Sequence, residues 1–387
     1  MTKPILIALR AGPAGPAAYP GPVTTVDLGV PRVRSAPPSA GPADPRFTTG
    51  PLRDRHGRVA RDLRVSLTDR CNLRCHYCMP PEGLPWLASD DVLSDAEVVR
   101  LIEVAVRDLG VHEVRFTGGE PLLRKGLEDV VAAVSRLRTD GGDPVRTSLT
   151  TNGIGLERRA PALAAAGLTR VNVSLDTLRA DRFAGITRRD RHADVLAGLA
   201  AATAAGLAPV KVNAVLLRGT NDDEAADLLR WALEAGYRLR FIEQMPLDPH
   251  GTWDRAQMVT AEEVLAALQE EFTLVPRPGT ARGSAPAETW DVLDAAGGRR
   301  GDVGIIASVT RPFCGDCDRT RLTADGQVRT CLFSTSETDL RTALRGGADD
   351  ATLAATWRAA MWGKLPGHDI DDPGFLHPTR PMSAIGG

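Results

Sequence analysis

The sequence predicts an α/β protein built as an incomplete (βα)6 barrel, followed by a C-terminal region of different character. From about residue 62, six runs with strand character alternate strictly with runs of helical length and periodicity. After roughly residue 260 this alternation stops. Strict alternation is typical of a parallel sheet with helical crossovers, and six units rather than eight favour an open arc over a closed barrel.

The six expected strands cover residues 62–68, 112–117, 145–150, 169–175, 208–217 and 237–245. Helices are expected between them at residues 94–110, 126–138 and 156–167, in the stretch that ends near 206, and at 223–236. The first helix has the clearest boundaries, because Ser94 and Glu97 have the spacing of a capping box and Gly110 ends it. Further helices are expected at 261–272 and near 337–345 and 351–362.

The composition restricts the class of protein. With 387 residues, 43% of them hydrophobic, the chain can form one large domain or two. A net charge of −2 argues against a polyelectrolyte partner such as a nucleic acid. No apolar run reaches the length of a membrane span, and the run before Arg10 is too short for a signal peptide. We therefore expect a cytoplasmic protein that does not bind a membrane.

The chain divides into three predicted segments. Residues 1–50 contain ten of the 28 prolines, with many glycines and alanines, and are expected to be a disordered tail. Residues 51–255 would form the partial barrel. Residues 256–387 would form an appended C-terminal region that packs against the sheet.

Unusual residues gather where the predicted strands end. A cysteine triplet follows the first strand, TGGEP (117–121) follows the second, and TTNG (150–153) follows the third. Ser174 and Met245 close the fourth and sixth strands, and Lys211 lies within the fifth. Because ligands of parallel α/β proteins bind at the C-terminal ends of the strands, these residues indicate one site in the mouth of the sheet.

The six cysteines form two triplets with none left over: Cys71, Cys75 and Cys78, then Cys314, Cys317 and Cys331. A long chain without an export signal favours metal over disulfides. Three thiolates in one loop suit a [4Fe–4S] cluster, whose fourth iron then stays open to a small molecule. A zinc site is the alternative, most of all for the second triplet if a fourth ligand lies elsewhere.

Basic side chains are predicted to converge on the same site. They lie on four expected strands and, in the second triplet, directly after its second cysteine: Arg64, Arg115, Lys211, Arg240, Arg319 and Arg321, with Thr320 between the last two. A charge aimed into a cavity is costly unless it meets an anion, so several together predict a polyanion such as a nucleotide phosphate chain.

The ordered motifs resemble those of one family. They are TDRCNLRCHYCMP, RFTGGEPLLRK, LTTNG, VNVSLD, VKVNAVLL, RFIEQMP, FCGDCDRTRLTADG and the closing IGG. From about residue 50 to the C-terminus the chain is similar to the GTP 3′,8-cyclases of the radical SAM (S-adenosylmethionine) superfamily. The CxxxCxxC triplet, with Tyr77 before its last cysteine, is the superfamily signature. The long Pro/Gly-rich start departs from the family pattern.

The resemblance implies a radical SAM barrel with two [4Fe–4S] clusters, the SAM-binding one on Cys71, Cys75 and Cys78 and the auxiliary one on Cys314, Cys317 and Cys331. It implies SAM contacts from Tyr77, Gly119, Ser174 and Met245. It implies GTP contacts from Arg64, Arg115, Thr150, Lys211, Arg240, Arg319, Thr320 and Arg321, and a C-terminal pair, Gly386 and Gly387, that reaches the active site. It also implies that Glu120 of the GGEP motif accepts a hydrogen bond from the SAM ammonium group.

The implied reaction converts GTP to (8S)-3′,8-cyclo-7,8-dihydroguanosine 5′-triphosphate, the first step of molybdenum cofactor biosynthesis. Cleavage of SAM would supply a radical that takes hydrogen from C3′, after which C3′ bonds to C8. Partners would be a low-potential electron donor and cyclic pyranopterin monophosphate synthase as the next enzyme, and the chain could form a homodimer. The alternatives are another radical SAM enzyme, such as a peptide-modifying maturase, or a zinc-stabilised binding module without catalysis.

Overall fold

The computed structural model describes residues 44–248, 251–277, 282–372, 375, 377–378 and 380–386. All of these belong to one compact unit of the chain, residues 37–387. Their strands form a 12-stranded sheet in the order β12-β11-β10-β1-β2-β3-β4-β5-β6-β9-β8-β7. The described helices include none that is long and apolar enough to cross a membrane.

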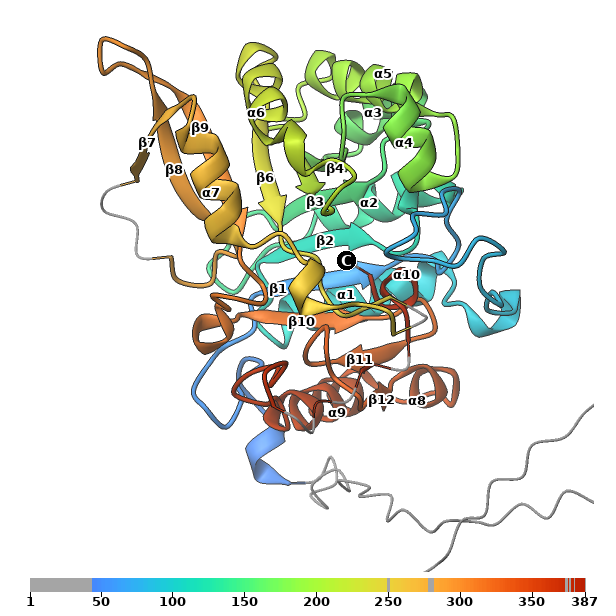
Figure 1. Ribbon diagram of the computed structural model, residues 1–387. Helices are drawn as coiled ribbons and strands as arrows, with labels where there is room; N and C mark the ends of the chain where they lie inside the picture. Colours follow the sequence, from blue (N-terminus) through green and yellow to red (C-terminus); the bar gives the residue numbers. More distant parts are fainter. Residues whose placement is uncertain are drawn as a thin grey trace, which may run out of the picture. The chain divides into compact units, whose positions relative to one another are not determined.

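The first six strands are neighbours in chain order, and each pairs with the next in parallel. They are β1 (Asp62–Ser66), β2 (Glu113–Thr117), β3 (Arg146–Thr151), β4 (Arg170–Ser174), β5 (Lys211–Val215) and β6 (Arg238–Ile242). The crossover helices are α1 (Asp95–Arg107), α2 (Leu127–Ser135), α3 (Leu156–Ala165), α4 (Ala180–Thr187), α5 (His192–Ala204) and α6 (Ala225–Glu234). The predicted α/β fold with six parallel strand–helix units is confirmed (Figure 1).

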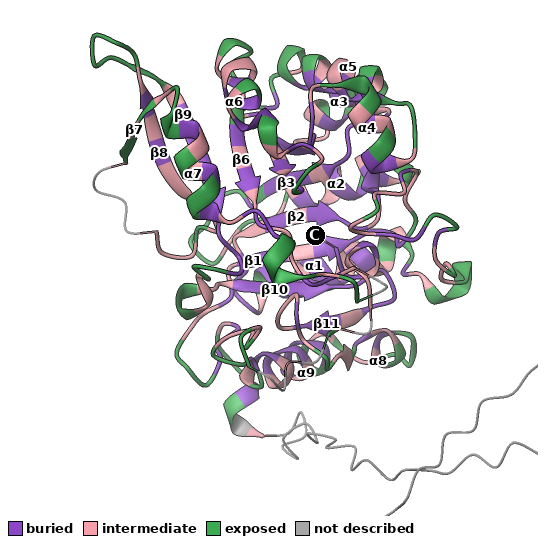
Figure 2. Cartoon of the chain, in the orientation of Figure 1, coloured by how far each residue is buried: buried purple, intermediate pink, exposed green. Residues whose placement is uncertain are grey.

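Local signals and burial agree with these elements. The capping box of α1 is present, since the Ser94 side chain accepts from the Glu97 backbone and the Glu97 side chain accepts from the Ser94 backbone. The central strands and the sheet-facing sides of the helices are buried (Figure 2). Apolar burial of this kind is the main stabilising contribution to a parallel sheet covered by helices.

The C-terminal region joins the sheet at both edges. On one side β9 (Arg299–Ile306) pairs in parallel with β6, followed by antiparallel β8 (Glu288–Leu293) and β7 (Thr273–Pro276). On the other side β10 (Arg319–Leu322) pairs in parallel with β1, followed by β11 (Gln327–Arg329) and β12 (Thr338–Asp339). The C-terminal region therefore does more than pack against the sheet, because its strands also satisfy the edge backbone groups of β1 and β6.

Four further helices complete the described chain: α7 (Ala261–Gln269), α8 (Arg341–Arg345), α9 (Asp350–Trp362) and α10 (Met382–Ile385). Helix α9 lies along β11 and β12, and its fully buried Trp357 donates a hydrogen bond to the Thr320 hydroxyl of β10 at 3.0 Å (Figure 1). This contact holds one face of β10, so the opposite face is turned toward the interior of the arc.

The predicted tail extends too far at its C-terminal end. Residues 1–43 lie outside the described residues, but Phe47 is 2% exposed and packs edge-on against Trp362. Arg358 donates hydrogen bonds to the carbonyl oxygens of Phe47 and Gly50 at 3.1 and 2.7 Å. The packed part of the chain therefore begins before residue 50, because these backbone acceptors are tied to α9.

Candidate active site

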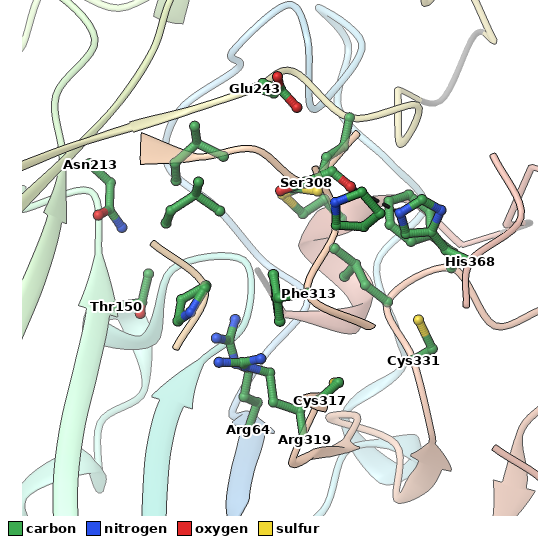
Figure 3. A pocket seen from close by; sticks show the side chains of 18 of the residues that line it. Arg64, Thr150, Asn213, Glu243, Ser308, Phe313, Cys317, Arg319, Cys331 and His368 are labelled. Carbon is green, nitrogen blue, oxygen red and sulfur yellow. Dashed lines mark hydrogen bonds between the residues drawn. The ribbon is translucent and has the colours of Figure 1, made fainter. Parts of the chain in front are cut away.

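A cavity of about 260 Å³ lies at the C-terminal ends of the parallel strands. Its walls include residues predicted to contact SAM, GTP and the auxiliary cluster. The predicted SAM contacts are Tyr77, Ser174 and Met245, and the cluster ligands are Cys314, Cys317 and Cys331. The predicted GTP contacts are Arg64, Arg115, Thr150, Arg240, Arg319 and Arg321. Figure 3 shows Arg64 and Arg319 reaching into this space from their strands, with Cys317 and Cys331 nearby. The structure thus brings most of the predicted GTP contacts together with the second cysteine triplet.

Three arginines form a row across neighbouring strands. Arg64 of β1 is in register with Arg321 of β10 on one side and with Arg115 of β2 on the other. Paired strands lie about 4.8 Å apart, so three like charges on one face repel one another unless an anion is bound. Burial, followed by the charge of Arg115, holds the pKa of Arg64 well below its usual value.

Several donors of this cluster are buried without a partner in the described part of the chain. They are Nε of Arg64, Nε of Arg115, and Nε and Nη1 of Arg319. Two carboxylates lie close to the cluster: Glu113 accepts a hydrogen bond from Arg115 Nη2 at 3.0 Å, and Asp62 is 3.8 Å from Arg115 and 3.6 Å from Arg319. Burial would raise the pKa of Asp62, but the charges of Arg115 and Arg64 outweigh it and lower that pKa. These two carboxylates leave the four guanidinium nitrogens without hydrogen bonds, so the site favours an anionic ligand.

Lys211 and Arg240 extend the positive face along β5 and β6. Burial lowers the pKa of Arg240 to about 10. Burial, followed by the charges of Arg240 and Arg170, lowers the pKa of Lys211 to about 7. Lys211 is not among the residues that line the cavity. Its charge nevertheless interacts with those of Arg240 and Arg115, which do line the cavity. Lys211 is the first residue of β5, two residues before Asn213 on the same face of the strand.

The structure corrects the prediction for the Thr320 side chain. Its hydroxyl is fully buried and accepts the hydrogen bond from Trp357 on the α9 face of the sheet. Side chains alternate across a strand, so Arg319 and Arg321 face the cavity while Thr320 faces away. A contact of Thr320 with substrate can therefore come only from its main chain.

The first triplet occupies the loop after β1. The thiols interact with one another, since burial and then the charge of Cys71 raise the pKa of Cys78 to about 12. Burial and then the charge of Cys78 also raise the pKa of Cys75 well above its usual range. The Cys71 sulfur accepts from the Leu73 amide at 3.4 Å and the Asn152 side chain at 3.9 Å. Three clustered thiols with raised pKa values need a metal cluster to become thiolates.

Tyr77 connects this loop to the cavity. It lines the cavity and donates a hydrogen bond from its hydroxyl to Asp176 at 2.7 Å. Asp176, just after β4, also accepts from the Val215 amide at 2.9 Å. Burial raises the pKa of Asp176 to about 6. The loop that carries the first triplet is therefore held to the ends of β4 and β5.

The GGE motif (118–120) packs directly against the chain that leads into the first triplet. A Cβ added at Gly119 would lie 2.3 Å from the Arg70 carbonyl oxygen, so only glycine permits this approach. Glu120 accepts from Thr151 Oγ1, Asn152 N and Leu122 N at 2.7, 2.7 and 2.9 Å. These hydrogen bonds tie the motif to β3, and the role of Glu120 as an acceptor for the SAM ammonium group stays a prediction.

The second triplet flanks β10 and β11: Cys314 and Cys317 come just before β10, Cys331 comes just after β11, and all three line the cavity. Burial and then the charges of Cys331 and Cys317 raise the pKa of Cys314 to about 11. Arg58 donates to the Cys314 carbonyl oxygen at 2.6 Å, and Lys364 donates to the Cys317 sulfur at 3.2 Å. Within the described residues, no group of three or more His, Cys, Asp or Glu side chains is arranged to hold a single metal ion.

The C-terminal segment enters the site beside both triplets. Arg321 donates a hydrogen bond to the Gly386 carbonyl oxygen, and the Ser383 amide donates to the Cys78 sulfur. Arg380 anchors the segment through both oxygens of Asp325, at 2.9 and 2.7 Å. Gly386 therefore lies in the site, as predicted for it, whereas Gly387 lies outside the described residues.

Gly386→Ala is expected to lower product formation by at least about tenfold. Gly386 has φ +76°, and an added Cβ would lie 2.4 Å from Ser66 Oγ and 2.6 Å from Thr117 Cγ2, so α10 would have to move. Gly347→Ala is the matched control, since Gly347 has φ +84° but open space around its Cα. The Gly347→Ala variant should lose only about 1–2 kcal/mol of folding stability, because alanine is strained in a left-handed backbone conformation. Equal losses of turnover in the two variants would contradict a role for Gly386 in the site.

Sequence reasoning missed several residues of the cavity wall, namely Asp176, Asn213, Phe313 and His368. Phe313 lies beneath the guanidinium of Arg319, 4.6 Å from its carbon to the ring centroid (Figure 3). Asn213 shares the cavity face of β5 with Val215, and its Oδ1 is buried without a hydrogen-bond partner among the described residues. The strand period could have indicated Asn213, but nothing local marks Phe313 or His368.

Two family models match the chain. The Radical SAM superfamily matches residues 65–232, and Molybdenum Cofactor Synthesis C matches residues 237–370. GTP 3′,8-cyclase of Streptomyces coelicolor is 64% identical over 87% of this chain and 96% of its own. GTP 3′,8-cyclase 2 of Mycobacterium tuberculosis is 61% identical over 94% and 100%. The chain belongs to the GTP 3′,8-cyclase family.

The fold of this cyclase also occurs in more distant proteins. A crystal structure of Streptococcus suis SuiB bound to S-adenosylmethionine aligns with a TM-score of 0.50 at 13% identity, over 75% of this chain and 66% of that chain. The likeness concerns the fold alone. The two family models meet between residues 232 and 237, before β6, whereas the sequence predicted a division after residue 255.

Proposed function

We propose that the cavity described above is where this GTP 3′,8-cyclase converts GTP to (8S)-3′,8-cyclo-7,8-dihydroguanosine 5′-triphosphate. This lyase reaction begins molybdenum cofactor biosynthesis. The observation that carries the assignment is the convergence on one cavity of the Arg321–Arg64–Arg115 row, Tyr77 of the first triplet and all three cysteines of the second. A polyanion and two metal clusters are the ligands that such a site requires.

The residues fit two [4Fe–4S] clusters and SAM. Each triplet presents three half-buried, unpaired cysteines whose charges act on one another's pKa. Cys71, Cys75 and Cys78 would hold the SAM-binding cluster, and Cys314, Cys317 and Cys331 the auxiliary cluster. When bound, the first cluster and SAM supply the radical chemistry at the ribose C3′. What remains for the protein is binding, orientation and exclusion of water.

SAM would contact Tyr77, Gly119, Ser174 and Met245. The Gly119 amide donates to Thr68 and the Glu120 amide to Arg70, both at 2.7 Å, which leaves the Gly119 carbonyl as the group that would accept from the SAM ammonium. Ser174 ends β4 and Met245 follows β6, so both stand on the rim of the cavity. These placements support a SAM molecule that lies across the strand ends beside Tyr77.

GTP would contact the cationic wall formed by Arg64, Arg115, Lys211, Arg240, Arg319 and Arg321, with Thr150 and the Thr320 main chain. The triphosphate would satisfy the unpartnered guanidinium donors, which gives them the hydrogen bonds that the protein itself does not provide. With the phosphates held there, the guanine would be oriented toward the open iron of the auxiliary cluster. Fixed orientation of C8 relative to C3′ is the positioning effect that cyclisation requires.

GTP affinity is expected to fall as the pH rises above about 7. The pKa of Lys211 in the free protein is about 7, and a nearby polyanion favours its charged form, so GTP binding takes up a proton. The dissociation constant should then rise by up to about tenfold per pH unit between the free and bound pKa values. Calorimetry in buffers of different ionisation enthalpy measures this uptake.

Lys211→Met should bind GTP more weakly at pH 7 and lose this part of the pH dependence. The variant retains any dependence that comes from GTP itself, so the difference between the two proteins reports Lys211 alone. Lys125→Met, at an exposed lysine, is the control. Identical pH profiles for Lys211→Met and the wild type would exclude Lys211 from the GTP site.

The decisive test of the proposed function is anaerobic incubation with SAM, a strong reductant and GTP. We expect 5′-deoxyadenosine to form in a GTP-dependent manner and deuterium placed at C3′ of GTP to appear in it. Deuterium that stays in the nucleotide would refute hydrogen removal at C3′. A low-potential electron donor, transfer of the product to cyclic pyranopterin monophosphate synthase, a homodimer and a cytoplasmic location remain predictions of the same proposal.

A further inference from the structure

Lys364 follows α9 directly and is 2% exposed. The chain uses arginine at nearly all of its basic positions and lysine only at Lys3, Lys125, Lys211 and Lys364. A lysine ammonium is a compact point charge with three donors, whereas arginine is a planar fork. A buried lysine in such a chain therefore indicates a site that needs a point charge.

The three donors of Lys364 are all used at the second triplet. Its Nζ lies 3.2 Å from the Cys317 sulfur, 3.2 Å from the Cys317 carbonyl oxygen and 2.8 Å from the Arg319 carbonyl oxygen. Within the described residues no ion pair joins Lys364 to an aspartate or a glutamate. The Cys317 sulfur is thus the group in contact with Nζ that can carry a full negative charge.

A buried ammonium without an anion is costly, and two carbonyl dipoles compensate only part of that cost. The charge is balanced when Cys317 is a thiolate, which is its state as a ligand of an iron–sulfur cluster. Two sulfurs of the triplet then differ in their hydrogen-bond donors. The Cys317 sulfur accepts from the Lys364 ammonium, and the Cys314 sulfur accepts from the His368 backbone amide. Cys317 receives a charged donor and Cys314 a neutral one.

We propose that Lys364 is a positioning residue of the auxiliary cluster, whose ammonium neutralises the Cys317 thiolate and raises the reduction potential of the cluster. Hydrogen bonds and positive charge at a cluster sulfur stabilise the reduced, more negative state. The same side chain fixes the main chain between Cys317 and Arg319, so it couples the cluster to a residue of the GTP wall. The inference rests on the proposed function, which requires the second cluster.

The test uses the full chain with the first triplet replaced by serine, so that only the auxiliary cluster is reconstituted. In this background, Lys364→Met removes the charge at similar length, and Lys364→Gln keeps a hydrogen-bond donor without charge. Lys125→Met is the matched control at an exposed lysine. The readouts are iron per chain after anaerobic reconstitution and the midpoint potential from a redox titration followed by electron paramagnetic resonance.

We expect both Lys364 variants to show a more negative midpoint potential or a lower iron content than Lys125→Met. Equal iron and equal potential in all three would overturn the inference. If circular dichroism shows that Lys364→Met does not fold, the iron content and midpoint potential of Lys364→Gln are compared with those of Lys125→Met instead. If the chain with an intact second triplet binds no cluster even with Lys364 present, the proposed function fails instead, so the two failures are distinguishable.

Discussion

Cys331→Ala is expected to reduce the iron content from about eight to about four atoms per chain and to abolish the cyclised product. The wild type holds two [4Fe–4S] clusters in the proposed function, and removal of one of three protein ligands leaves the auxiliary cluster without a stable site. Product should be lost because the auxiliary cluster, which Cys314, Cys317 and Cys331 would hold at the cavity wall, would no longer help to position the purine. Iron and sulfide assays, with product analysis by mass spectrometry, check this result.

Cys71→Ala is the comparison variant, because it should also lose about four irons but from the other cluster. Cys331→Ala is expected to retain slow SAM cleavage, whereas Cys71→Ala is expected to cleave none. This contrast assigns a separate role to each triplet. A wild-type chain with four irons and one zinc would contradict the two-cluster assignment and favour a zinc site at the second triplet.

Arg319→Ala is expected to weaken GTP binding by about 2–4 kcal/mol, or roughly 30- to 1,000-fold in Kd. Two of its nitrogens, Nε and Nη1, are buried without a hydrogen-bond partner in the described part of the chain, although Nε lies 3.6 Å from Asp62, and the third, Nη2, donates to the Ser284 carbonyl at 2.8 Å. A phosphate bound there would lose charge-assisted hydrogen bonds in a desolvated wall. Calorimetric titration with GTP measures the loss.

Two controls separate the phosphate contact from a general effect. Guanosine should bind Arg319→Ala and the wild type with similar affinity, because it has no phosphates. Arg230→Ala removes a half-buried arginine of α6 that pairs with Asp227 and Glu271 and does not line the cavity, and it should leave the GTP affinity unchanged. A loss for guanosine as large as for GTP would show that Arg319 does not act through the phosphates.

Local patterns in the sequence predicted much of the fold. Period-two strands, amphipathic helices and the Ser94–Glu97 capping box depend on neighbours within a few residues, so they can be read without tertiary structure. The pairing of β10 with β1 joins Arg321 to Arg64 across about 250 residues, and no local pattern specifies it. It follows from the unsatisfied backbone of the β1 edge, which only the assembled sheet reveals.

The sequence by itself determined the ligand chemistry of this protein: two cysteine triplets, each one thiolate short of a full cluster, and an excess of cationic side chains near the strand ends. The tertiary structure alone decided which of these groups meet. It placed Arg319 and Arg321 on the cavity face and turned Thr320 toward Trp357, and it engaged Glu120 with β3. It also buried Lys364 against Cys317. Residue type and spacing define what a side chain can bind, whereas its neighbours depend on long-range packing.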